Sequence, residues 1–142
     1  METIFEEFNI DLSASAIFNA FVSDNYSVFL DNSLNSSTLL NYSYITSDPF
    51  LIITSKGNNI KIKERETEKE FFGNPFNILN GLIDKYNFDD NINIAPFQGG
   101  AIGYMSYEMR HHIEHMPSNA LDYLELPEMC FGFYDWVISI NH

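Results

Sequence analysis

Five consecutive residues, 111–115, carry the side chains best suited to metal chemistry. They read HHIEH and match the pattern H-x-x-E-H, in which two histidines one helical turn apart, here His111 and His115, bind zinc while a glutamate acts on water. Such a motif lies within a long helix and needs a third protein ligand, whereas Met116 and Pro117 follow at once. The alternative is a polar helix end with solvated histidines, and we favour it, so no metal site is predicted.

A second candidate is the segment FQGGAIGYMSYE, residues 97–108, with Gly99, Gly100 and Gly103 ahead of Tyr104. A phosphate-binding loop would aim backbone N–H groups at the anion from a helix start. However, the segment contains neither G-x-G-x-x-G nor G-K-[ST]. Positive φ at the turn into a strand, or close backbone packing, explains these glycines better. We therefore predict a structural glycine motif.

The remaining composition excludes several classes of function. The sequence has 142 residues, with 20 acidic and 7 basic side chains and a net charge of −13, which repels nucleic acids and anionic lipid. The single cysteine, Cys130, lies in the apolar run MCFGFY, where it resembles a small buried hydrophobe and fits a reducing cytoplasm. The sequence shows no export signal, membrane span or nucleophile elbow. No catalytic residue is predicted from the residues alone.

Two or three helices and several strands must position these groups. Apolar spacing predicts a helix over residues 11–22, with Asp11 or Ser13 as N-cap, and Asn74 followed by Pro75 predicts the start of another. Strands are expected at 26–32, 49–54, 60–66, 101–107 and 129–141, and the KGNN turn joins two of them in a meander. The fold class is therefore α+β, with a mainly antiparallel sheet and one core.

Three segments, taken in order, resemble a known family. FLDNSLNSSTLLNYSYITSDPFLIITSKGNNI (29–60) resembles a Leu-Leu-(Glu/Asp)-Ser element, a Tyr-Ser strand and an (Ala/Ser)-Asp-Pro turn. PFQGGAIGYMSYEMRHHIEHMP (96–117) resembles a Pro-Phe-x-Gly-Gly-x-x-Gly-Tyr segment. LPEMCFGFYDWVISINH (126–142) is similar to a Leu-Pro-(Asp/Glu) strand that ends in (Asn/Asp)-His. The family is that of chorismate-utilising synthases: component I of anthranilate synthase and of para-aminobenzoate (aminodeoxychorismate) synthase.

The resemblance implies that residues 1–142 are the N-terminal domain of a component I, part of a larger β-sandwich, and inactive alone. The abrupt end at His142 fits a fragment whose chorismate-binding catalytic domain, with its magnesium, is absent. The implied partners are that catalytic domain and a glutamine amidotransferase subunit. Self-association of the fragment is also expected, because its apolar surface lacks cover. The Tyr134-Asp135-Trp136 triplet favours the para-aminobenzoate branch of folate biosynthesis, with anthranilate synthase and tryptophan biosynthesis as the alternative.

The resemblance also implies a binding pocket, because the Leu-Leu-Glu-Ser element and the Tyr-Ser strand help to hold tryptophan in relatives. The matching positions include Leu30, Asp31, Asn32, Tyr42 and Ser43. Asp31 is suited to accept from an ammonium group and Asn32 to donate to a carboxylate. The alternative from the residues themselves is an Asx-type turn after a strand.

Overall fold

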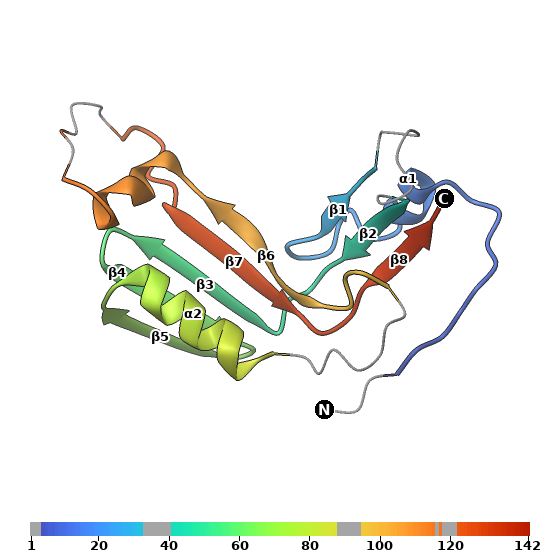
Figure 1. Cartoon of the computed structure of the whole chain (residues 1–142), viewed down its shortest axis with the longest axis horizontal. Coiled ribbons are helices and arrows are strands. Elements are labelled where there is room, and N and C mark those ends of the chain that lie inside the picture. Colours follow the sequence, from blue (N-terminus) through green and yellow to red (C-terminus); the bar gives the residue numbers. More distant parts are fainter. Residues whose placement is uncertain (1–3, 33–40, 88–94, 116, 118–121) are drawn as a thin grey trace. The chain divides into compact units, whose positions relative to one another are not determined.

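The computed structural model describes residues 4–32, 41–87, 95–115, 117 and 122–142 (Figure 1). Its described residues form two antiparallel sheets and three short helices, which confirms the α+β class. The chain divides into two compact units. The small-sheet unit contains the described residues up to Asp48, residues 95–99 and residues 135–142; the large-sheet unit contains residues 49–87 and the described residues of 100–134.

The large-sheet unit is built on five antiparallel strands in the order β5-β4-β3-β7-β6. They are β3 (Leu51–Lys56), β4 (Asn59–Glu64), β5 (Thr67–Phe72), β6 (Gly100–Met105) and β7 (Met129–Tyr134). The predicted meander is confirmed: β3 and β4 pair from Leu51 opposite Glu64 to Lys56 opposite Asn59. Gly57 makes the tight turn between them with a φ of 53°. The third strand of the meander, β5, was not predicted.

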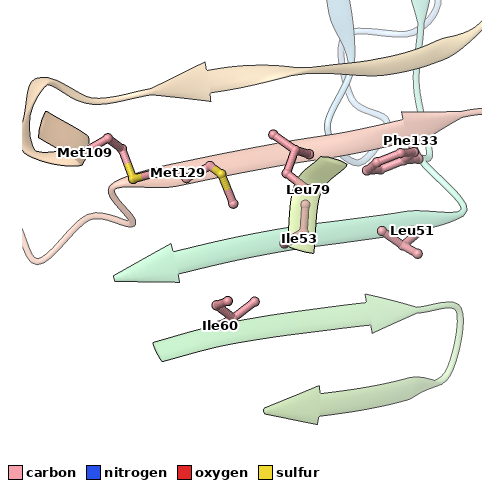
Figure 2. Packing of buried hydrophobic residues seen from close by; sticks show 7 residues of the cluster. All are labelled: Leu51, Ile53, Ile60, Leu79, Met109, Met129 and Phe133. Carbon is pink, nitrogen blue, oxygen red and sulfur yellow. The ribbon is translucent and has the colours of Figure 1, made fainter. Parts of the chain in front are cut away.

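Helix α2 (Pro75–Lys85) covers one face of this sheet. Asn74 caps it as predicted: the side-chain oxygen accepts from the N–H groups of Phe76 and Asn77, at 3.0 and 3.3 Å. Leu79 then packs into a cluster of side chains that are at most 4% exposed (Figure 2). The other members are Leu51, Ile53, Ile60, Met109, Met129 and Phe133.

The small-sheet unit holds helix α1 (Ala14–Phe18) and three strands in the order β1-β2-β8. These strands are β1 (Val28–Leu30), β2 (Tyr42–Thr46) and β8 (Ile138–Asn141). Phe29 lies opposite Ile45 in the sheet, and Ile45 lies opposite Ile138. Phe18 of α1 stacks on Phe29 with ring centroids 5.1 Å apart, which places the helix against this face of the sheet.

Two predicted elements differ from the structure. The single strand expected over 129–141 is wrong, because β7 ends at Tyr134 and β8 begins at Ile138 in a different sheet. The helix expected over 11–22 is much shorter: it begins after Ser13, whose Oγ accepts from the Ala16 N–H at 3.2 Å, and turns follow its end at Phe18. Within the described residues, no helix is both long and apolar enough to cross a bilayer.

Candidate ligand site at Ser43

The structure divides the five predicted pocket residues between the two faces of the small sheet. Since side chains alternate along a strand, Ser43 and Ile45 share one face of β2, and Tyr42 and Tyr44 share the other. Leu30 lies opposite Tyr44 and so belongs to the second face, with 45% of its side chain exposed. Asp31 and Asn32 follow β1 and contact Ser43.

Ser43 is completely buried, and its hydroxyl is the centre of a polar cluster. Its Oγ donates to Asp31 Oδ1 at 2.8 Å and accepts from the Asn32 N–H at 3.2 Å. A third neighbour, His142 Nε2, lies 2.7 Å away. Because the hydroxyl donates its one proton to Asp31 Oδ1, it can only accept from His142, so the His142 tautomer in this contact carries its proton on Nε2. One donated and two accepted hydrogen bonds then fill the capacity of this hydroxyl.

His142 is the site residue that the sequence did not identify. Register places it there: Ser43 lies opposite Ile140, Tyr42 lies opposite Asn141, and the His142 N–H donates to the Asn41 carbonyl at 2.8 Å. The contact joins positions 99 residues apart, which no local pattern predicts. The sequence did contain one signal for this residue: segment 126–142 ends in the (Asn/Asp)-His pair of the family, but the sequence analysis gave that pair no role.

The opposite face of β2 carries aromatic rings. Tyr42 and Tyr44 stack with centroids 6.1 Å apart, and the ring of Phe97 meets Tyr44 edge-on at 5.6 Å. Burial raises the pKa of the Tyr44 phenol, and the neighbouring Tyr42 adds to that rise. Tyr42 therefore belongs to an aromatic surface rather than to the cluster around Ser43.

Two further buried hydroxyls in this unit are also paired. Thr46 Oγ1 donates to the Trp136 carbonyl at 2.7 Å, and Ser47 Oγ donates to Asp24 Oδ2 at 3.0 Å. Both residues are 1% exposed. The interior of the small-sheet unit is therefore fixed by directed hydrogen bonds as well as by apolar packing.

The glycine motif has a conformational explanation in the structure. Gly99 and Gly100 have φ angles of 131° and 126°, values that side chains rarely adopt. A Cβ at Gly103 would lie 2.0 Å from the Cys130 carbonyl oxygen and 2.6 Å from Phe131 Cα. Tyr104 donates from its hydroxyl to the Pro127 carbonyl at 3.1 Å. The positive φ angles explain Gly99 and Gly100, and the close approach of β7 explains Gly103, so no bound anion is needed to account for the motif.

The HHIEH segment does not form one continuous helix. A short 3-10 helix, η1 (Tyr107–His112), ends before Glu114, so His111 and His115 do not share a helical face. His111 Nε2 lies 3.0 Å from Glu108 Oε2, and His112 packs edge-on against Phe76. The described residues contain no group of three or more His, Cys, Asp or Glu side chains placed to hold a metal ion.

Comparison with known proteins gives consistent results. The chain is 37% identical over 102 residues to anthranilate synthase component 1 of Acetivibrio thermocellus, a match that covers 71% of this chain and 21% of that protein. It is 28% identical over 102 residues to aminodeoxychorismate synthase component 1 of Escherichia coli strain K12, covering 71% of this chain and 22% of that protein. No protein-family model matches the chain.

A solved structure shares the fold. The crystal structure of anthranilate synthase component I from Streptococcus pneumoniae TIGR4 aligns with a TM-score of 0.61 at 18% identity, over 99% of this chain and 30% of that one. The matched residues make up only about a fifth of the length of the two curated relatives described above.

Proposed function

Because this chain is homologous to component I of anthranilate and aminodeoxychorismate synthases, we propose that it is the N-terminal, non-catalytic domain of a chorismate-aminating synthase. The first assignment is para-aminobenzoate synthase component I, in folate biosynthesis. The alternative is anthranilate synthase component I with a tryptophan-binding regulatory site. The 37% identity to an anthranilate synthase supports the alternative, and the Tyr134-Asp135-Trp136 triplet supports the first assignment.

The observation that carries this proposal is a sheet covered on one face. Helix α2 buries Leu51 and Ile53 of β3 on that face. On the other face, Ile52 and Ile102 lie in one row across Gly132 and are half-buried, and Tyr134 is 2% exposed. Towards β5 the same face is polar: Lys61 pairs with Glu70 there, and Phe72 is 80% exposed. Half-buried apolar side chains such as Ile52 and Ile102 normally pack against a second layer, which the rest of a protein more than three times as long would supply.

The proposed partners follow from the same assignment. The remainder of component I would bind chorismate and magnesium, and a glutamine amidotransferase subunit would supply ammonia. This chain would contribute a folded layer of the sandwich and no reacting group. We therefore expect no turnover of chorismate by the 142-residue chain alone.

A chimera tests this role. Residues of this chain replace the matching 21% of the Acetivibrio thermocellus protein, and chorismate amination is measured with ammonium as the nitrogen source. We expect the chimera to form anthranilate and the isolated chain to form no product. A folded but inactive chimera, or turnover by the isolated chain, would contradict the proposal.

The cluster around Ser43 supports a second role, binding of an α-amino acid such as tryptophan. The Asp31 carboxylate and the His142 imidazole flank one hydroxyl, at 2.8 and 2.7 Å, and both side chains belong to exposed residues. An ammonium group would bind Asp31, and a carboxylate would bind His142 rather than the Asn32 side chain predicted from the sequence. Ser43 would hold these two side chains in place, since its own hydrogen bonds are already made.

Calorimetry with L-tryptophan tests the amino-acid site. The original chain should give saturable heat, and Asp31→Asn should lower the affinity about tenfold or more by removing the charge opposite the ammonium group. Asp48→Asn is the matched control, because it removes another exposed carboxylate of the same unit, one that accepts from Asn25 Nδ2 at 3.2 Å. Absence of heat at millimolar tryptophan would contradict this role and leave the structural one.

A further inference from the structure

The contact between His142 and Ser43 determines where the imidazole of His142 takes up a proton. The Ser43 hydroxyl donates its one proton to Asp31 Oδ1 at 2.8 Å, so it accepts from the Nε2–H of His142 at 2.7 Å. In the neutral side chain, the lone pair is therefore on Nδ1. Among the described residues, none forms a hydrogen bond or an ion pair with Nδ1, and His142 is exposed. This nitrogen is thus accessible to a proton and to a ligand.

The protonation state of this nitrogen determines which ligand group it can bind. A lone pair at Nδ1 accepts from an ammonium group and repels a carboxylate, whereas a protonated Nδ1 donates to a carboxylate in a charge-assisted hydrogen bond. Histidine is the side chain that ordinarily changes its charge between about pH 5 and 8. Protonation at Nδ1 leaves the Nε2–H in place, so the hydrogen bond to Ser43 persists and the imidazole keeps its position in both states.

Few charged groups lie next to this imidazole. Asp31 faces it across the Ser43 hydroxyl. From the β2 side, the Asn41 carbonyl accepts from the His142 N–H at 2.8 Å, and Tyr42 belongs to the opposite face of the sheet. Helix α1, which lies against this face, carries no charged side chain, and no ion pair among the described residues involves Asp31 or His142. The Asp31 carboxylate and the terminal carboxylate of the 142-residue chain are therefore the charged groups adjacent to the ring.

On the basis of the amino-acid site proposed above, we propose that this site takes up one proton at His142 Nδ1 when an α-amino acid binds. The ammonium group of the ligand pairs with Asp31, and its carboxylate pairs with the protonated imidazole. Loss of the proton leaves a site that binds an amine but repels a carboxylate. Because only the protonated fraction binds the amino acid, the apparent affinity falls as the pH rises, by up to about tenfold per pH unit once most of His142 is neutral.

Calorimetry of L-tryptophan binding at about pH 5.5 and about pH 8 tests this coupling. We expect the Kd to rise about tenfold or more between the two pH values. Tryptamine is the matched ligand, because it has the ammonium group but no carboxylate, and its Kd should not rise. A tryptophan Kd that is equal at both pH values, or a parallel rise for tryptamine, would overturn the coupling and leave the amino-acid site standing. Absence of heat at both pH values would overturn the coupling and the site together.

Variants assign the proton to His142. In His142→Gln the amide donates to Ser43 as the imidazole does but does not titrate, so tryptophan should bind weakly and with the same Kd at both pH values. His115→Gln is the matched control, because His115 is exposed and belongs to the large-sheet unit, and it should keep the pH dependence. A chain extended by Gly-Ser-Gly after His142, which moves the terminal carboxylate away, should also keep it. A pH dependence that survives in His142→Gln, or that the extension abolishes, would overturn the assignment.

Discussion

The two units bury different kinds of side chain. The large-sheet unit closes one face with aliphatic, methionine and phenylalanine side chains supplied by α2, β3, β4, β7 and η1. The small-sheet unit buries Ser43, Thr46 and Ser47 beside Ile45, and each of these three hydroxyls is hydrogen-bonded. An apolar core can repack after a substitution at modest cost. Removing one partner of a buried hydroxyl leaves that hydroxyl without a hydrogen bond and lowers the stability of the protein.

The proposed amino-acid site lies in the unit with the buried hydroxyls. Apolar burial in the large-sheet unit provides the stable scaffold, because it removes more hydrocarbon from water. In the small-sheet unit, polar groups that directly follow β1 and β8 meet at the Ser43 hydroxyl of β2. A molecule that bridges those groups would stabilise the small-sheet unit.

Of the substitutions considered, Gly103→Ala should cause the largest loss of stability in the large-sheet unit. The new methyl group would meet backbone atoms of Cys130 and Phe131, which cannot swing aside, so we expect a loss of about 4 kcal/mol or more in the free energy of unfolding. Urea denaturation measures it. Gly81→Ala is the control: Gly81 is exposed in α2 and its added methyl meets nothing within 4 Å, so the helix should gain about 0.5–1 kcal/mol.

A smaller loss should follow from opening a cavity in the same core. Ile53 is completely buried between β4 and β7, and Ile53→Ala should destabilise the protein by about 2–5 kcal/mol. Ile83→Ala removes the same atoms from a side chain of α2 that is 44% exposed, so it should lower stability by less than about 1 kcal/mol. Similar losses for the two variants would contradict the placement of the core.

The effect of Ser43→Ala should be local. Removing the hydroxyl leaves the Asn32 N–H and His142 Nε2 without their acceptor, for a loss of about 1–3 kcal/mol. Hydrogen exchange should show faster exchange in β1, β2 and β8 and no change in β3 and β7. Faster exchange throughout the large-sheet unit would show that the two units do not respond separately.

The mildest probe is the thiol of Cys130 on β7. Burial raises the pKa of this thiol, so less thiolate is present at a given pH than for a free cysteine. Alkylation at pH 8 should therefore be slower than that of a free cysteine and should accelerate in urea. A rate equal to that of a small-molecule thiol before unfolding would contradict the burial of this strand.

Features of the fold that depend on neighbouring residues were predicted correctly from the sequence. Asn74 and Pro75 predicted the start of α2, and KGNN predicted the turn between β3 and β4. The break between β7 and β8 was missed because Asp135 and Trp136 continue a strand-like pattern, although the partners of the two halves lie in different sheets. Asp31 and Ser43 were predicted by resemblance, but the contact of His142 with Ser43 depends on the pairing of β2 with β8 and has no local signature.

The most direct test of this division of roles is a tryptophan titration of the ¹⁵N-labelled chain, followed residue by residue by NMR. The account predicts saturable shifts at Asn32, Ser43 and His142, little change along β3 and β7, and loss of the response in Asp31→Asn. Saturable shifts centred on the large-sheet unit, or no shifts around Ser43, would contradict it.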